Sequence, residues 1–207
     1  MTLADRCAAF RTAYAKWPAS WPYLVKEQGR DVLYATWLIG AMWGSETPYY
    51  GSYPRTYLAR VMALFPPPKP TLRDRGHEAP SILHVFSGSV PAGPYVRLDI
   101  NPECGAELVG SVYDLGKMFL GRRPFRLVLA DPAYSAEDSQ RYGTDMINRL
   151  KATKAVAAVT KPGGHMVWLD TCWPQFKKTQ WATVGRITII RSTNHRVRLC
   201  SIFERAA

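Results

Sequence analysis

Three groups of residues that could bind a ligand stand at the ends of short apolar runs in this 207-residue chain. The first is the turn Ser87-Gly88-Ser89, the second is Asp99 and the third is Asp131. A turn of small residues lets the backbone approach a ligand closely. A carboxylate at the end of a strand can accept two hydrogen bonds from the diol of a ribose. The three groups, in this order along the chain, predict a ligand site.

The elements that must position these residues are strands that alternate with helices. Four short apolar runs are predicted strands: 82–86, 95–100, 125–130 and 165–169. The segments around 103–109 and 137–159 can be helices between them. This alternation is typical of a mostly parallel α/β sheet, in which ligands bind at the carboxyl ends of the strands. Two last runs, 186–190 and 198–203, flank a polar turn and predict an antiparallel hairpin that closes the sheet.

The first 70 residues are predicted to form a helical extension, separated from a core at 71–207 by the proline-rich joint 65–70. From Tyr23 to Trp43, apolar residues recur every three or four positions, which is the spacing of one face of a helix. A second helix is expected to begin at Ser52-Tyr53-Pro54 and to run through Leu64, because proline is favoured in the first turn of a helix.

The order of these elements resembles that of the class I S-adenosylmethionine-dependent methyltransferases. Val85-Phe86-Ser87-Gly88 is similar to the first motif of that family, which wraps the methionine part of the cofactor. In this chain Ser89-Val90-Pro91 stands where another glycine is common. Asp99, followed by Ile100, matches the acid that binds the ribose hydroxyls. The resemblance implies a Rossmann-like, seven-stranded sheet and S-adenosylmethionine as the cofactor.

Two further segments extend this resemblance. The segment 110–115 resembles the motif that contacts the adenine ring; because the family often has an acid at the place of Ser111, Asp114 or a backbone group is expected to take that role. The segment 51–58 resembles the one that precedes the first motif in DNA amino-methyltransferases, which implies that Tyr53 and Pro54 lie nearest the methionine end of the cofactor. The alternative for this segment is an amphipathic helix that only packs against the core.

The tetrapeptide Asp131-Pro132-Ala133-Tyr134 resembles the Asp-Pro-Pro-Tyr motif of enzymes that methylate N6 of adenine or N4 of cytosine in DNA. An exocyclic amine is a poor nucleophile because its lone pair is delocalised into the ring. The resemblance implies that the Asp131 carboxylate and the Pro132 carbonyl accept hydrogen bonds from the two N–H groups of this amine. The lone pair of the nitrogen is then free to attack the methyl group. Tyr134 would stack on the target base after this base has flipped out of the nucleic-acid duplex. Ala133 departs from the second proline of the motif, which leaves the rate and the choice of base open.

The charge of the chain fits a polyanionic partner. The net charge is +11, and each Lys or Arg near a phosphate displaces a condensed counterion. Residues 1–80 carry 10 Lys and Arg against 6 Asp and Glu, residues 81–139 carry 5 against 7, and residues 140–207 carry 12 against 3. This distribution favours a nucleic acid held at the periphery of a central ligand site; a basic surface without a partner is the alternative.

Other classes of site are disfavoured. The four Cys and four His are scattered without metal-ligand spacing, so no metal site is expected. The chain shows no signal peptide and no apolar run of membrane-spanning length, so a soluble, cytoplasmic protein is expected. A homodimer is possible from the sequence.

These features predict a methyltransferase that acts on a base amino group in nucleic acid, with adenine N6 in DNA preferred to RNA. Only about forty residues separate the first motif from Asp131, which leaves no room for a large recognition insertion and predicts low sequence specificity. One alternative is an RNA base amino-methyltransferase. The other is a nucleic-acid-binding homologue with impaired catalysis, which the altered turn at 89–91 and Ala133 would favour.

Overall fold

The computed structural model describes residues 1–40, 53–54, 56–67, 80–192 and 195–207. These residues form one nine-stranded sheet in the order β1-β2-β8-β9-β7-β6-β3-β4-β5. The strands are β1 Tyr23–Glu27, β2 Arg30–Ile39, β3 Ile82–Val85, β4 Val96–Asp99, β5 Leu108–Val109, β6 Phe125–Ala130, β7 Thr160–Asp170, β8 Trp181–Arg191 and β9 Val197–Arg205. The α-helices are α1 Leu3–Ala13, α2 Tyr57–Leu64, α3 Leu115–Met118, α4 Ala136–Arg141 and α5 Arg149–Val159, and the 3₁₀ helices are η1 Pro18–Ser20, η2 Pro102–Cys104 and η3 Val112–Asp114.

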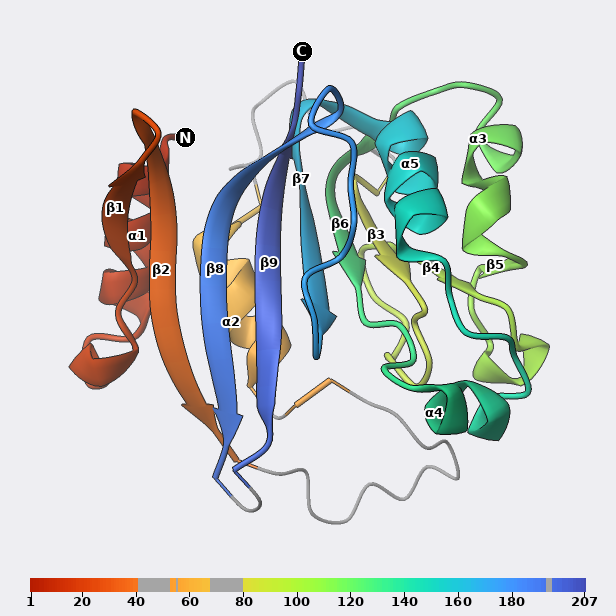
Figure 1. The fold of residues 1–207 in the computed structure, drawn as a ribbon, viewed down its shortest axis with the longest axis horizontal. Helices are drawn as coiled ribbons and strands as arrows, with labels where there is room; N and C mark the ends of the chain where they lie inside the picture. The colour runs from red at the N-terminus through yellow and green to blue at the C-terminus, as the bar shows by residue number, and fades with distance from the viewer. Residues whose placement is uncertain (41–52, 55, 68–79, 193–194) are drawn as a thin grey trace.

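The pairing of the strands confirms the predicted mostly parallel α/β sheet with a C-terminal antiparallel hairpin. Strands β5, β4, β3, β6 and β7 pair in parallel, and β9 runs antiparallel to both β7 and β8. The carboxyl ends of the parallel strands therefore lie at one edge of the sheet, which is the lower edge in Figure 1.

The helix predicted from Tyr23 to Trp43 is wrong over its described part, because these residues form β1 and β2. The two strands form a hairpin around Gln28 and Gly29, both with positive φ, and β2 then pairs in parallel with β8. From Leu33 onward the buried residues of β2 alternate, as a strand requires: Leu33, Ala35, Trp37 and Ile39; Val32, just before them, is buried as well. The apolar residues whose spacing predicted a helix lie on both faces of this strand. The sheet consequently has two strands more than the seven that were expected.

Helices cover the two faces of the sheet unequally (Figure 1). One core cluster joins α1 and α2 to strands from β2 to β3. The other joins α3 and α5 to β3, β4, β6 and β7, with Trp181 and Phe203 at its margin. On that second face, no described helix covers β1, β2 and β8. The predicted helix through Leu64 is confirmed as α2, but it begins at Tyr57, and Tyr53 and Pro54 precede it. The boundary expected at residues 70 and 71 lies outside the described residues.

The connections in the core differ in part from the expected helices. The segment 103–109 forms the end of η2 and the short strand β5 rather than a helix. A proline and a glycine bound η2, and Gly105 has a positive φ of 59° at its C-cap, so the helix cannot continue. The segment 137–159 holds two helices, α4 and α5, each begun by a side-chain cap, from Ser135 and Asn148.

A pair of neighbouring substitutions tests the strand assignment of β2. Trp37 is fully buried and donates from Nε1 to the Ser20 carbonyl at 3.2 Å, whereas Leu38 is 60% exposed. We expect Trp37→Ala to lower the free energy of unfolding by about 3–5 kcal/mol and Leu38→Ala by less than about 0.5 kcal/mol, measured by urea denaturation. Equal losses would contradict the alternation of a strand.

Candidate active site

Three aspartates lie at the carboxyl edge of the parallel strands. Asp99 ends β4, Asp131 directly follows β6, and Asp170 ends β7. Because β4, β3, β6 and β7 run in parallel and in neighbouring positions, the three carboxyl groups are brought to the same side of the molecule. Sequence reasoning identified the first two and missed Asp170.

The turn after β3 is closed by Asp99. Phe86 and Gly88 both adopt positive φ, of 58° and 49°, which folds the chain sharply back after the strand. The Gly88 amide donates to Asp99 Oδ2 at 2.8 Å, and the Asn101 amide donates to Oδ1 at 3.0 Å. Ser87 is buried, and its Oγ has no hydrogen-bond partner among the described residues. The structure thus brings together the turn and the acid that were predicted to bind a ligand.

The residues predicted beside them lie farther out. Ile100 directly follows Asp99 and is 53% exposed. The segment 110–115 begins next to Asp99, since the Gly110 amide donates to the Asp99 carbonyl at 2.9 Å. Asp114, however, pairs with Lys117 at 3.1 Å on the surface. The role of Asp114 toward an adenine ring stays a prediction.

The Asp131 carboxyl group lies in an environment that favours its neutral form. Burial raises its pKa from 3.8 to about 7, and the charge of Asp170 acts in the same direction. Arg198 and a hydrogen bond from the Tyr134 hydroxyl to Oδ1 oppose this rise. The Arg198 guanidinium carbon lies 4.7 Å from the centre of the Tyr134 ring. Asp131, Tyr134 and Arg198 therefore form one connected polar group.

Tyr53, in the segment that precedes α2, lies near this group. Its ring stacks on Tyr57 with centroids 5.3 Å apart and meets His84 edge-on at 6.0 Å. Its buried hydroxyl has no hydrogen-bond partner among the described residues. Burial raises the pKa of Tyr53 well above its usual value, and the charge of Asp131 adds to the rise. The carbonyl of Pro54, which is also buried, accepts from the Tyr57 amide at 3.0 Å in a turn that precedes α2.

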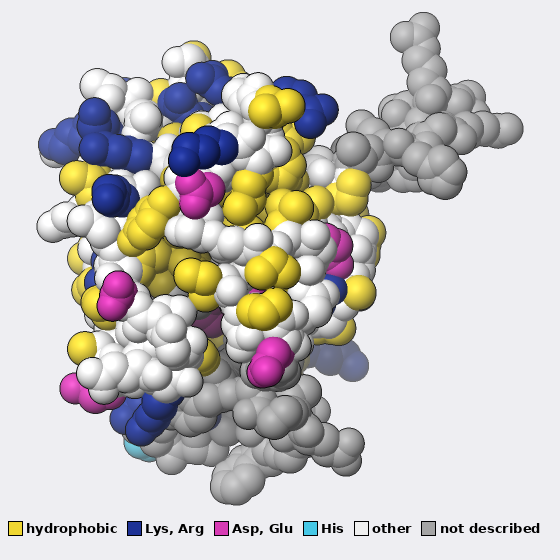
Figure 2. Space-filling view, turned by 90° about the vertical axis from the view of Figure 1, so that its right-hand side faces the viewer, with side chains coloured by type: hydrophobic (Ala, Val, Ile, Leu, Met, Phe, Trp, Pro, Cys, Tyr) yellow, Lys and Arg dark blue, Asp and Glu magenta, His cyan; other side chains and the backbone are white. Residues whose placement is uncertain are grey.

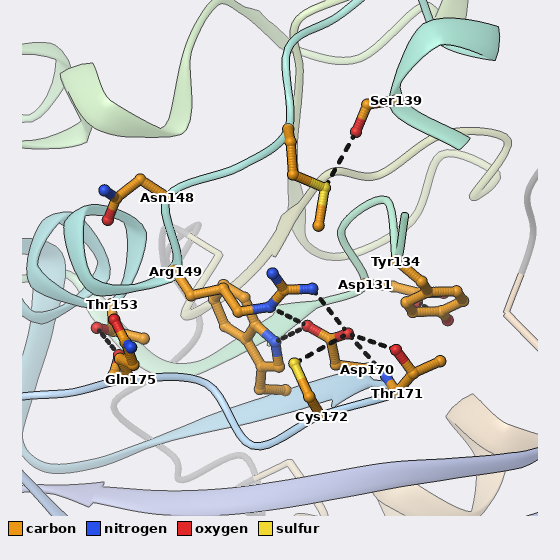
Figure 3. A network of polar contacts seen from close by, with 12 residues as sticks. Asp131, Tyr134, Ser139, Asn148, Arg149, Thr153, Asp170, Thr171, Cys172 and Gln175 are labelled. Carbon is orange, nitrogen blue, oxygen red and sulfur yellow. Dashed lines mark hydrogen bonds and ion pairs between the residues drawn. The ribbon is translucent and has the colours of Figure 1, made fainter. Parts of the chain in front are cut away.

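Asp170 is the centre of a second network (Figure 3). Its carboxylate is fully buried and accepts from Arg149 Nε at 2.8 Å and Nη2 at 3.1 Å. It also accepts from Trp168 Nε1 at 3.0 Å and from the Thr171 amide at 2.7 Å. A bidentate guanidinium pair of this kind fixes both partners. The network therefore ties the first residue of α5 to the end of β7 and holds Thr171 in place.

An open cleft of about 600 Å³ lies beside these networks. Its walls come from the Asp131 loop, α4, the end of β7 and the start of β9: Tyr134, Ser135, Glu137, Asp138, Arg141, Thr171, Arg196, Val197 and Arg198. The volume is in the range typical of small-molecule sites. The lining residues include three arginines and two acids, and Arg141 lies 3.9 Å from Asp138, so the cleft has a small excess of positive charge.

Sequence reasoning missed Asp170, Arg149 and Arg198. Asp170 could have been found from the sequence, because it directly follows an apolar run, as Asp131 does. Arg149 and Arg198 could not, since each acts on a residue from a distant part of the chain. Within the described ranges, no group of three or more His, Cys, Asp or Glu could hold a metal ion. No helix in the described part of the chain is long and apolar enough to span a membrane.

Comparisons with known proteins give a likeness of fold alone. No protein-family model and no curated protein matches the sequence. TrmN from Thermus thermophilus is a similar solved structure, with 14% identity and a TM-score of 0.43 over 60% of this chain. The match covers 43% of the TrmN chain, so this chain spans less than half of that protein.

Two further solved structures are similar at the same level. An rRNA methylase from Streptococcus thermophilus has 10% identity and a TM-score of 0.40, over 63% of this chain and 89% of that chain. The N-methyltransferase NodS from Bradyrhizobium japonicum WM9 has 15% identity and a TM-score of 0.40, over 61% and 85%.

The ion pair of Asp170 makes a testable contribution to stability. Arg149→Met would leave a fully buried carboxylate without its counter-charge, which typically costs about 3–5 kcal/mol. We expect a loss of that size in urea denaturation at neutral pH, and a smaller loss when Asp170→Leu is added to Arg149→Met. A double variant less stable than the single one would contradict this account.

The raised pKa of Asp131 predicts a pH-dependent cost to folding. Its pKa is 3.8 without the influence of the fold and about 7 in the folded protein. Below pH 3.8 the group is neutral in both states, so its ionisation does not lower the free energy of unfolding. The cost grows as the pH rises toward 7 and is constant above that. We expect Asp131→Asn to stabilise the protein by roughly 1–3 kcal/mol at pH 8 and by little at pH 4, allowing for partial solvent screening. Asp138→Asn, a cleft residue, is the control; equal behaviour of both variants would contradict the assignment.

Proposed function

We propose that this chain is an S-adenosylmethionine-dependent methyltransferase that acts on an exocyclic amino group of a nucleic-acid base, with adenine N6 in DNA as the preferred target. The observation that carries the proposal is the placement of Asp131, Pro132 and Tyr134. They stand at the carboxyl edge of the sheet, where α/β proteins bind ligands, and Tyr134 lines the cleft.

The residues around Ser87 and Asp99 fit the cofactor. The unpartnered, buried Oγ of Ser87 and the tight turn at Gly88 suit a polar ligand that approaches the backbone closely. Asp99 would hold the ribose, and the exposed side chain of Ile100 offers an apolar surface beside it. When bound, S-adenosylmethionine supplies a methyl group activated by a sulfonium. Phe86, Tyr53 and Pro54 are proposed to face its methionine end.

The reacting amine is proposed to bind at Asp131. The Asp131 carboxylate and the Pro132 carbonyl would accept its two N–H groups, so that the nitrogen lone pair is directed away from the ring. A carboxyl group with a pKa of about 7 is suited to take the proton that nitrogen loses as its new bond to carbon forms. Tyr134, whose hydroxyl already bonds Asp131, would stack on the base.

The charge of the molecule supports a polyanionic substrate. Arg141, Arg196 and Arg198 line the cleft itself. Figure 2 shows further Lys and Arg gathered at the upper end of the face drawn there, away from the carboxyl edge of the sheet. The short connections between β3 and β6 agree with loose sequence specificity.

Methyl transfer and cofactor binding separate the proposed roles. We expect Asp131→Asn to lower the rate of methyl transfer to DNA by roughly 100-fold or more, because one electrostatic contact to the reacting centre is typically worth that much. Cofactor affinity, measured by calorimetry, should be unchanged in Asp131→Asn and lost in Asp99→Ala.

The matched control is Asp138→Asn, which changes an aspartate of the same cleft that does not contact Asp131. It should keep most of the activity. An Asp131→Asn variant that is fully active would contradict the proposed role of Asp131. No heat on titration with excess cofactor would contradict the enzyme itself and favour a binding protein.

A further inference from the structure

An aromatic surface lies on the uncovered face of β1, β2 and β8. It consists of Tyr23 on β1, Tyr34 on β2, Arg186 on β8 and Trp173 in the segment that leads to β8; we call these four residues the platform. Tyr23 is 54% exposed and Trp173 is 46% exposed, and Tyr34 and Arg186 are half-buried. Figure 1 shows this face toward the viewer, with α1 and α2 behind the sheet.

The four side chains of the platform are in consecutive contact. The Tyr23 and Tyr34 rings lie 6.1 Å apart with an interplanar angle of 25°. The Arg186 guanidinium carbon lies 5.8 Å from the centre of the Tyr34 ring and 5.6 Å from that of Trp173. The arrangement is a row of planar groups with one cation inside it.

Arg186 is held in this row by Glu27. Its Nη1 donates to both Glu27 oxygens, at 2.5 and 2.6 Å, and lies 2.5 Å from the Tyr34 hydroxyl oxygen. The hydrogen bonds of Arg186 to Glu27 and Tyr34 all use Nη1. Because the row is already ordered, a ligand would lose little side-chain entropy on binding to it.

The platform and the cleft are close to each other along the chain and across the sheet. Trp173 stands two residues after Thr171, which lines the cleft. A second path runs across the sheet, where Leu38 is in register with Ile190 and Ile190 with Val197. Leu38 is 60% exposed and Val197, another cleft residue, is 51% exposed. A chain leaving the cleft would therefore meet Val197 and Leu38 before it reaches Tyr34, which lies on the same face of β2 as Leu38.

We propose that the platform binds single-stranded nucleic acid next to the target base. Base faces stack on aromatic side chains and on guanidinium planes whatever their sequence, which fits a row of two tyrosines, an arginine and a tryptophan. The net charge of +11 and the arginines of the cleft complement the phosphates. Bases paired in a duplex could not reach these rings. The inference rests on the proposed function only for the class of polymer.

The test uses a fluorescein-labelled oligothymidylate of about 20 nucleotides and fluorescence anisotropy. Thymine has no exocyclic amino group, so this probe reports binding without being a methyl acceptor. We expect Trp173→Ala and Tyr23→Ala each to weaken binding by about 10-fold, within the range of a lost stacking contact. The control is Trp17→Ala, which removes a tryptophan that is 64% exposed and follows α1 on the opposite face; it should bind like the wild type.

Two results would overturn the inference. One is unchanged oligothymidylate affinity in both Trp173→Ala and Tyr23→Ala. The other is a wild-type dimer in sedimentation that these variants dissociate without loss of oligothymidylate affinity, because the face would then join two copies of the chain.

Probe binding and methyl transfer, measured on the same preparations of the wild type and Trp173→Ala, separate this inference from the proposed function. Loss of binding in Trp173→Ala together with no methyl transfer by the wild type would support the platform and contradict the enzyme. Unchanged probe binding in Trp173→Ala together with methyl transfer by the wild type would contradict the platform and support the enzyme.

Discussion

The parallel pairing of β4, β3, β6 and β7 is the constraint on which the site depends. Parallel strands place all their carboxyl ends at one edge, so acids that are far apart in sequence are collected there without any direct contact between them. Asp99 and Asp131 reach this edge from strands separated only by β3. The antiparallel β9 then delivers its beginning, with Arg198, to the same edge. The hydrogen bonds between the strands of the sheet thus bring the turn after β3, the aspartates and Arg198 to one edge.

Burial of charge at this edge has a cost that the fold offsets locally. Asp170 is fully buried, but Arg149 and two further donors compensate it. Asp131 has weaker compensation, from Tyr134 and Arg198, and its pKa rises to about 7 as a result. A carboxyl group poised near neutrality is a poor choice for stability and a good one for proton transfer. The weak compensation of Asp131 is the physical reason to propose it as the group that takes the proton.

The predictable parts of the fold were those with local signals. Strands that end on Asp99 and Asp131 were found because an apolar run followed by an acid is readable in the sequence. The N-terminal region was misread because Leu33, Trp37 and their neighbours satisfy both helical and strand spacing over a short window; the two-residue turn at Gln28 and Gly29 was the overlooked signal. The partners of Asp170 and Tyr134 could not be predicted, because Arg149 and Arg198 reach them only through the pairing of distant strands. The same holds for the platform, which exists only because β2 adds to β8.

The central claim is that this site transfers a methyl group to a base amino group. The most direct measurement supplies cofactor with a labelled methyl group together with single-stranded DNA, duplex DNA or RNA, and digests each polymer to nucleosides. We expect label in N6-methyldeoxyadenosine from DNA. Label in RNA alone would contradict the preference for DNA, and absence of label from every nucleoside of all three polymers would contradict the claim itself.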